Sequence, residues 1–262
     1  MWEYSMRLGS LIGVVLALWG CSKEHNATTK IIGHAATGLN ISNAIYHDNS
    51  REAIDYALSL PHCSGVEVDV RMDANGQLWL FHDESLDATT NLTGIVETSS
   101  TEYLESGWYR SLKKERLTAL TPDVINLLSK GTTFLDIKGT ESTNINSWLS
   151  SLLSLNLDTS KYRIIVPSEV YFDGLKSYFP TFLAIRDFSQ LNSSILENEP
   201  ELRGICIRNE NITREQVNFL KSIHHQTVIY EVRSSKGISS ALKKDPAYLL
   251  SDDVKLAVGL RY

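Results

Sequence analysis

The run GVEVDV, residues 65–70, contains two acidic side chains whose spacing suits metal binding. Residues two apart in a strand point to the same face, so Glu67 and Asp69 share one face while the valines share the other. Their Cα atoms are then about 6.6 Å apart, at roughly 3.3 Å per residue. Two carboxylates at this spacing can reach one Ca²⁺ or Mg²⁺, because both ions prefer oxygen ligands. The alternative is a solvent-exposed strand face, on which carboxylates cost little.

Four further residues with suitable chemistry stand near the ends of apolar runs. His34 follows KIIG, His82 ends QLWLFH, and Asp136 and Lys138 alternate in LDIK. Imidazoles titrate near neutral pH and suit proton transfer. Each residue also has a structural interpretation, as a packed histidine or as a surface ion pair. Their common position at strand ends favours a single site.

The elements that must position these residues alternate along the chain. Strand candidates are residues 30–35, 65–72, 77–82, 132–139, 162–168, 181–188, 203–209, 227–234 and 248–253. Helical spacing is clearest in residues 50–60, 121–130, 142–157 and 213–226. Strands that alternate with helices predict a parallel sheet covered by helices.

The DANG segment, residues 73–76, separates two strand candidates too closely for a parallel connection. Asn-Gly is a strong hairpin signal, and a parallel crossover needs about a dozen residues. Residues 77–82 therefore fold back on residues 65–72, which leaves eight strands. The prediction is an α/β fold, a TIM (β/α)8 barrel with a β-hairpin after strand 2. Residues 84–120 lack this rhythm and are interpreted as a short insertion at the barrel mouth.

Composition and cysteine spacing exclude other classes of protein. The 262-residue chain has a formal net charge of −6 and no Lys/Arg run, so it is not expected to bind nucleic acid through the phosphates. Cys63 and Cys206 are far apart and lack metal-ligand spacing. We interpret them as two buried thiols rather than as a disulfide.

The N-terminal segment indicates export. Leu8–Cys21 is apolar apart from Ser10, shorter than the stretch of about 20 residues that spans a bilayer, and typical of a secretion signal. The sequence LWGC that ends it resembles the lipobox of bacterial lipoproteins, in which the cysteine is acylated. A buried N-terminal helix is the alternative interpretation.

This interpretation divides the chain into three parts. Residues 1–21 would be a lipoprotein signal peptide with lipidation at Cys21, residues 22–29 a polar tether, and residues 30–262 the barrel. The expected location is the bacterial cell envelope, with a lipid anchor in the membrane, at the outer membrane or the periplasmic face.

Several segments together resemble the glycerophosphodiester phosphodiesterase family. They are GHA, DNSREAIDYAL, GVEVDVRMDANGQLWLFHDESLDATTNLTG and LDIKG, and they cover most of residues 30–140. The corresponding family motifs are His-Arg-Gly, Glu-Asn-Thr, Glu-x-Asp-Val with a hairpin ending in His-Asp, and Glu-x-Lys. Later, VIYEVRS and LLSDD are similar to the family's Trp-Thr-Val strand and closing Thr-Asp. The family's fold is a TIM barrel, in agreement with the strand count.

The resemblance implies a reaction and a role for each candidate residue. It implies hydrolysis of glycerophosphodiesters to glycerol 3-phosphate and an alcohol, with one divalent cation, Ca²⁺ or Mg²⁺, as cofactor. The partner would be a small-molecule or lipid-derived phosphodiester. The implied roles are general acid and base for His34 and His82, metal ligation for Glu67, Asp69 and Asp136, and phosphate binding for Lys138.

Three positions depart from the family pattern. Ala35 replaces the arginine that follows the first histidine in the family, where it contacts phosphate. Ala88 replaces a second arginine, and Asp136 replaces a glutamate that is one methylene longer. Loss of a charge-assisted hydrogen bond weakens binding by about 1.5–3 kcal/mol, which does not abolish catalysis.

Two other functions therefore stay open on the sequence alone. One is a catalytically inactive lipoprotein that binds phosphodiesters, which the two alanines favour and the two histidines oppose. The other is a related barrel phospholipase that acts on phosphoinositides or sphingolipids. Asp252 and Asp253, in LLSDD, are interpreted either as barrel-mouth residues or as caps of a helix or turn.

Overall fold

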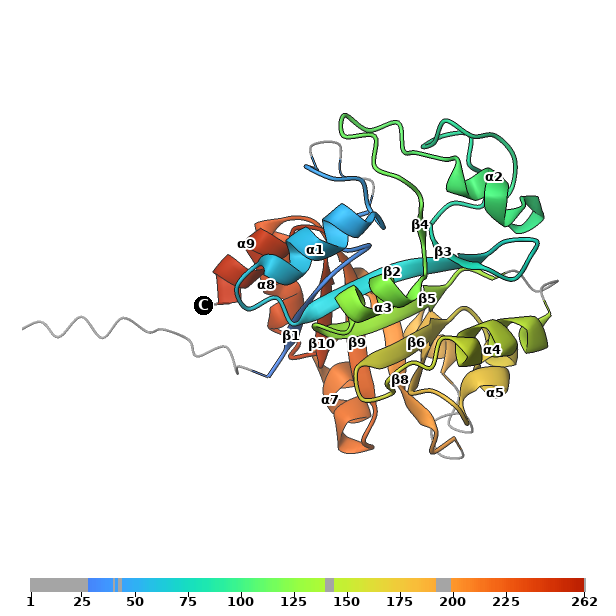
Figure 1. Ribbon diagram of the computed structural model, residues 1–262. Coiled ribbons are helices and arrows are strands. Elements are labelled where there is room, and N and C mark those ends of the chain that lie inside the picture. The colour runs from blue at the N-terminus through green and yellow to red at the C-terminus, as the bar shows by residue number, and fades with distance from the viewer. Residues whose placement is uncertain (1–27, 40, 42–43, 140–143, 192–198, 262) are drawn as a thin grey trace, which may run out of the picture.

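The computed structural model describes residues 28–39, 41, 44–139, 144–191 and 199–261. Within these residues the strands curl into a barrel, with helices on its outside (Figure 1). The predicted lipobox, including Cys21, and most of the predicted tether lie outside the described residues. Among the described residues, no helix combines the length and apolar character needed to cross a bilayer.

Eight parallel strands close the barrel, because the last of them pairs with the first. In order around the barrel they are β1 (Lys30–Gly33), β2 (Gly65–Met72), β5 (Thr132–Ile137), β6 (Tyr162–Val166), β7 (Thr181–Ile185), β8 (Leu202–Arg208), β9 (Gln226–Val232) and β10 (Tyr248–Ser251). The predicted TIM barrel is therefore confirmed.

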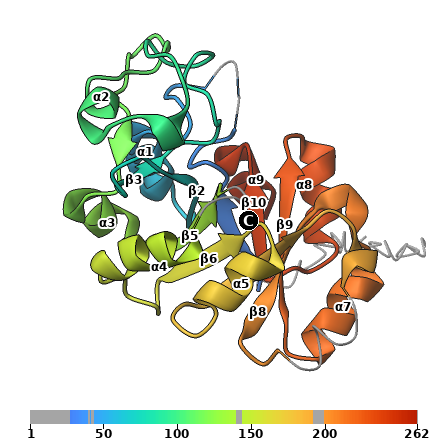
Figure 2. The same ribbon diagram turned by 90° about the vertical axis from the view of Figure 1, so that its right-hand side faces the viewer.

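The helices lie around this barrel (Figure 2). They are α1 (Arg51–Ser59), α3 (Pro122–Leu128), α4 (Ile145–Ser154), α5 (Glu169–Leu175), α7 (Arg214–Ser222), α8 (Ser235–Leu242) and α9 (Val254–Arg261), with 3-10 turns η2 (Phe188–Gln190) and η3 (Asn209–Asn211). Side-chain caps fix two of the predicted starts. Ser50 Oγ accepts the Ala53 N–H at 3.1 Å, and Thr213 and Gln216 form a capping box.

The predicted hairpin is also present. The strand β3 (Leu78–Leu80) runs antiparallel to β2, and Asp73 Oδ1 in the turn accepts the N–H groups of Asn75 and Gln77. The insertion then adds η1 (Val96–Thr98), α2 (Thr101–Glu105) and the two-residue strand β4 (Thr118–Ala119), which pairs with β3. The insertion and the hairpin share a separate small core of Trp79, Phe81, Leu86, Leu92, Val96, Leu104 and Tyr109.

Side-chain alternation sets what faces the barrel interior. The interior cluster consists of Ile32, Phe134, Ile165, Phe182, Cys206, Val228, Tyr248 and Leu250. The strand β2 adds none of these residues, because its valines at 66, 68 and 70 pack outward in the core under the helices. Its inward positions are therefore Glu67 and Asp69, as the alternation in the sequence predicts.

The pairing of β2 with β5 depends on a close approach at Gly65. A Cβ atom at this position would lie 1.8 Å from the backbone oxygen of Thr132, which cannot move without breaking the strand pair. We expect Gly65→Ala to lower the free energy of unfolding by about 2–3 kcal/mol through overpacking. Urea denaturation measures this change. Gly259→Ala is the control, because its Cβ meets nothing within 4 Å; equal losses in both variants would contradict the argument.

Candidate active site

Three carboxylates meet on the paired strands β2 and β5. Glu67 and Asp69 are 1% and 0% exposed, and Asp69 is paired in register with Asp136 on the neighbouring strand. One oxygen from each of the three residues lies within 4.8 Å of the other two. Such a cluster is unfavourable by itself for two reasons. Its like charges repel one another, and burying each charge costs on the order of several kcal/mol. The three predicted metal ligands are thus brought together.

The hydrogen bonds of this cluster leave oxygen atoms available for a cation. Glu67 Oε2 accepts the Ala35 N–H at 2.7 Å, and Asp69 Oδ2 accepts from Asn49 Nδ2 at 2.8 Å. Among the described residues, Glu67 Oε1 is buried and accepts no hydrogen bond. A buried acceptor without a partner is costly. The donor set, three carboxylates with an orphaned oxygen, therefore fits a hard divalent cation.

Lys138 offsets part of this negative charge. Its Nζ atom lies 2.6 Å from Asp136 Oδ2 and 2.9 Å from Asp69 Oδ1. Burial opposes the ammonium charge, but the two carboxylates raise the pKa of Lys138 well above its ordinary value. Although burial favours its neutral form, Asp69 has a lowered pKa because of Lys138. Lys138 thus stays charged beside the cluster.

One lysine does not neutralise all three acids. Burial and the neighbouring charge of Asp69 raise the pKa of Glu67 to about 8, from 4.5. Burial likewise raises the pKa of Asp136. In the metal-free protein at neutral pH, a proton therefore takes part of the role that a cation would have.

His34 is oriented by an acidic residue from the last strand of the barrel. Its Nδ1 atom lies 2.7 Å from Asp252 Oδ1, and its Nε2 atom lies 3.9 Å from Glu67 Oε2. Burial disfavours protonation, but the Asp252 hydrogen bond and the Glu67 charge outweigh it and raise the pKa of His34 to about 9. The Nδ1 contact leaves Nε2 as the nitrogen available for proton transfer.

His82 has the same arrangement on the hairpin side of the mouth. Its Nδ1 atom lies 2.8 Å from Asp83 Oδ1. Its backbone is fixed by Arg71, which is largely buried and donates from Nε to the His82 carbonyl at 2.9 Å. The same guanidinium donates to Glu97 Oε1 at 2.5 Å and to the Lys138 carbonyl at 3.2 Å. Arg71 thereby ties His82 to the end of β5.

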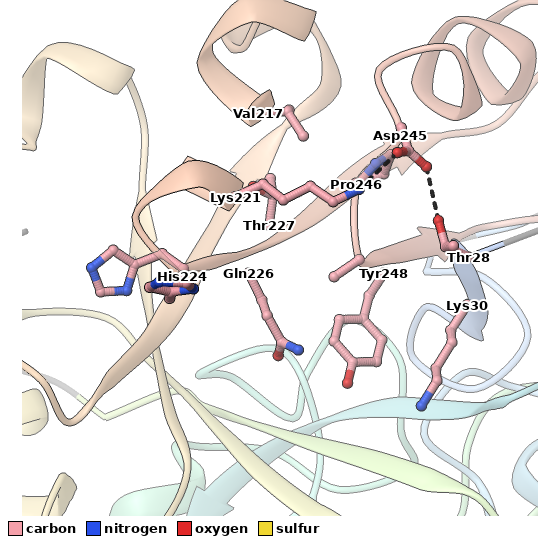
Figure 3. A pocket seen from close by; sticks show the side chains of 12 residues that line it. Thr28, Lys30, Val217, Lys221, His224, Gln226, Thr227, Asp245, Pro246 and Tyr248 are labelled. Carbon is pink, nitrogen blue, oxygen red and sulfur yellow. Dashed lines mark hydrogen bonds and ion pairs between the residues drawn. The ribbon is translucent and has the colours of Figure 1, made fainter. Parts of the chain in front are cut away.

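Both histidines open on one cavity of about 570 Å³ at the carboxyl ends of the strands. Asp136 and Lys138 line the same cavity, so the predicted acid–base pair and the predicted phosphate ligand face a common space. A second hollow, of about 330 Å³, lies at the opposite end of the barrel (Figure 3). Its carboxylate, Asp245, is bound by Thr28 and Lys221, each at 3.0 Å, so it is not available to a ligand.

The turn after His34 shows what the alanine at position 35 does. Ala35 is fully buried, has a left-handed backbone with φ of 43°, and accepts the Asn49 N–H at 3.0 Å through its carbonyl. Its own N–H donates the hydrogen bond to Glu67 Oε2. The backbone at this position therefore supports the acidic cluster, while the side chain gives the cavity no positive charge.

The geometry agrees with a comparison of the sequence to protein families. Residues 34–257 match the model described as Glycerophosphoryl diester phosphodiesterase family. The chain belongs to this family. The match begins at His34, directly after β1, and covers the other seven barrel strands.

Similarity to an individual relative in the glycerophosphoryl diester phosphodiesterase family covers a smaller part of the chain than the match to the family model does. A curated glycerophosphodiester phosphodiesterase from Bacillus altitudinis is 31% identical over 111 residues, which are 41% of this chain and 43% of that protein. The aligned part thus spans less than half of the curated relative.

Solved structures show the same fold at low identity. A phosphodiesterase from Oleispira antarctica, in complex with the product sn-glycerol-3-phosphate, superposes with a TM-score of 0.73 at 17% identity and covers 89% of this chain and 96% of its own. A glycerophosphodiester phosphodiesterase from Agrobacterium tumefaciens gives 0.70 at 20% identity, with coverage of 88% and 99%. One from Thermotoga maritima gives 0.72 at 16% identity, with coverage of 89% and 98%.

The structure decides between the two interpretations of the paired aspartates: Asp252 contacts His34 at the barrel mouth, whereas Asp253 caps α9 by accepting the Leu256 N–H at 2.9 Å. Asn49 and Arg71 are further residues of the site, and neither stands out in the sequence by type or spacing. The Asp-Asn-Ser segment, matched to the family's Glu-Asn-Thr, was the available signal for Asn49. Cys63 and Cys206 are free thiols, as expected, although Cys63 is only partly buried.

The acidic cluster generates a prediction about stability. Because the pKa of Glu67 is raised in the folded state, the folded metal-free protein keeps a proton that the unfolded chain releases, so stability falls as pH rises from about 4.5 through about 8. We expect Ca²⁺ or Mg²⁺, at one fixed concentration that is a hundred times its dissociation constant at pH 8, to raise Tm by about 5–10 °C at pH 8. The same concentration should raise Tm less at pH 5.5, because protons compete for the carboxylates. Thermal unfolding monitored by circular dichroism measures this.

The control separates the cluster from general charge effects. Glu67→Gln should lose most of the cation-induced shift in Tm without lowering the stability of the metal-free protein. Glu102→Gln, an exposed position on α2, should keep the wild-type shift. A cation response in Glu67→Gln equal to that of the wild type would contradict a cation site at this cluster.

Proposed function

We propose that this protein hydrolyses glycerophosphodiesters to glycerol 3-phosphate and an alcohol, with a divalent cation as cofactor. One observation carries the proposal: two imidazoles, each with Nδ1 bound to a carboxylate, line the same cavity as Asp136, one member of the three-carboxylate cluster. This arrangement supplies two proton-transfer groups beside a place for cationic charge. A phosphodiester anion needs both. Family membership and the product named for the Oleispira protein support the same substrate class.

The two histidines divide the proton transfers. One imidazole takes the proton from the attacking hydroxyl as the new P–O bond forms, and the other gives its proton to the alkoxide as the old P–O bond breaks. By the family's chemistry the attacking hydroxyl is that of the glycerol itself, and water then opens the cyclic phosphate with the roles reversed. Asp252 and Asp83 hold the two rings so that each Nε2 faces the substrate.

Charge on the phosphate is balanced from the β2–β5 side. Lys138, held between Asp69 and Asp136, presents a positive charge to the cavity. A Ca²⁺ or Mg²⁺ held by Glu67, Asp69 and Asp136 would supply the further positive charge that stabilises non-bridging phosphate oxygens. Asn49 and the Ala35 N–H keep the carboxylates oriented toward that position.

A direct assay on glycerophosphocholine tests the proposal. We expect the wild type to release glycerol 3-phosphate, and EDTA to abolish the release until excess cation is restored. His34→Ala and His82→Ala should each lower kcat by about a hundred- to ten-thousand-fold, the range of general acid–base catalysis. His224→Asn is the control, since it is an exposed histidine at the other end of the barrel and asparagine tolerates its φ of 68°.

Other outcomes would identify the other two functions. Tight calorimetric binding of glycerophosphocholine without turnover would indicate the inactive binding protein. Hydrolysis of phosphoinositide or sphingolipid in vesicles, with no release of glycerol 3-phosphate from soluble diesters, would indicate the phospholipase. Activity that resists EDTA would contradict the role of the cation.

We also propose that the protein is held at the bacterial cell envelope by acylation of Cys21. The support is the apolar run that ends in LWGC. Thr28, the first described residue, lines the hollow at the end of the barrel opposite the active-site cavity (Figure 3). The chain therefore enters the barrel at the end opposite the mouth.

Detergent-phase partitioning tests this anchor. Full-length protein expressed in a bacterial host should enter the detergent phase, and Cys21→Ser should move it to the aqueous phase. Cys63→Ser is the matched control and should partition as the wild type does. Wild-type protein that already stays in the aqueous phase would exclude the lipid anchor.

A further inference from the structure

A β-bulge near the mouth changes the side-chain direction at the end of β9. Leu249 of β10 pairs with Ile229, and Ser251 pairs with Val232, so two steps along β10 match three steps along β9. Glu231, the extra residue, has a left-handed backbone with φ of 63°. Bulges next to active sites commonly re-aim a side chain in this way.

The bulge turns Arg233 toward the cavity. Val228 and Tyr230 face the barrel interior and Ile229 faces outward. Uninterrupted alternation would next place position 232 inside and position 233 outside. With the extra residue, Val232 returns to the outer core and Arg233 lines the active-site cavity. The strained backbone at Glu231 thus has a direct consequence for the composition of the site.

The contacts of Arg233 place its guanidinium beside the His34 pair. Arg233 Nε lies 3.1 Å from Asp252 Oδ2, and the other oxygen of that carboxylate lies 2.7 Å from His34 Nδ1. One carboxylate thus separates the guanidinium from the imidazole. The Arg233 side chain is 52% exposed, and its two Nη groups make no hydrogen bond or ion pair with a described residue. Because Arg233 lines the cavity, these terminal N–H groups are available to a ligand there.

The other arginines of the cavity are committed elsewhere. Arg71 uses its guanidinium on the His82 and Lys138 carbonyls and on Glu97. Arg208 pairs through Nε with Glu231 Oε2 at 3.0 Å, and Tyr230 also contacts it. Arg208 and Arg233 are both anchored through Nε, but Arg208 has a second partner in Tyr230. For Arg233, Asp252 is the one partner among the described residues, so its terminal donors stay available to an anion.

We propose that Arg233 is a phosphate-binding residue of this site and supplies, from the end of β9, the positive charge that the side chain at position 35 does not. The inference rests on the proposed function, because it assigns a contact to the substrate of that reaction. The phosphate then lies between two cationic groups that line the cavity, Lys138 after β5 and the Arg233 fork after β9. The planar fork suits two phosphate oxygens and selects for a phosphorylated ligand.

Calorimetry with two probes, sn-glycerol 3-phosphate and inorganic phosphate, tests the contact apart from turnover. In the full-length protein with cation present, Arg233→Gln should weaken binding of each probe about ten- to a hundred-fold, the effect of one charge-assisted hydrogen-bond pair. Arg233→Lys should fall between, because it keeps the charge and loses the fork. Arg203→Gln is the matched control: it removes the same charge from an exposed position on β8 at the other end of the barrel.

Kinetics separate binding from positioning through Asp252. Arg233→Gln should raise KM for glycerophosphocholine by a similar factor and leave the pH profile of kcat in place. Unchanged probe affinity, with a lower kcat and a shifted pH profile, would overturn the proposal and leave Arg233 as a positioning residue for His34. Failure of the wild type to bind either probe would also overturn it.

The two proposals fail differently. If the wild type hydrolyses no glycerophosphodiester, yet binds sn-glycerol 3-phosphate and loses that affinity in Arg233→Gln, the hydrolase function fails and the phosphate contact stands. If the wild type is active and Arg233→Gln binds both probes as tightly as the wild type does, the contact fails and the function stands.

Discussion

Repulsion among three carboxylates on two paired strands is the constraint on which this site depends. Glu67, Asp69 and Asp136 are held within 4.8 Å of one another by the register of β2 and β5, and a single lysine offsets their charge. The raised pKa of Glu67, about 8, expresses the remaining imbalance. A divalent cation bound there would relieve it, because it would replace a proton with two positive charges at a site that already lacks a hydrogen-bond donor.

The other residues of the barrel mouth surround the negative charge of the three carboxylates. Closure of the barrel brings Asp252 to His34, the hairpin brings His82 to the opposite side, and Arg71 ties the hairpin to the end of β5. Each imidazole is fixed through Nδ1 and offers Nε2 to the same cavity. Lys138 and Arg233 bring positive charge from separate strands. The positions of the cluster, of the proposed proton-transfer groups and of the proposed anion ligands therefore follow from where the strands end, as in other barrels of this kind.

Parts of this arrangement follow from the sequence by local rules. The period of two in GVEVDV sets the inward direction of Glu67 and Asp69, and the short DANG turn requires the hairpin that carries His82. The contact between His34 and Asp252 joins residues 218 positions apart, so only barrel closure creates it. The direction of Arg233 could not be predicted, because regular alternation from Val228 gives the opposite face. The bulge is seen only in the structure, from the register shift between β9 and β10 and the left-handed backbone at Glu231.

A crystal structure with Mn²⁺, a probe with anomalous scattering and oxygen preferences close to those of Mg²⁺, tests the central claim most directly. The account predicts one anomalous peak at the mouth, with oxygens of Glu67, Asp69 and Asp136 at about 2.0–2.6 Å from it. It also predicts that Lys138 keeps its contact with at least one of these acids. An anomalous map with no peak at the cluster at saturating Mn²⁺, or with a peak ligated elsewhere, would contradict the account.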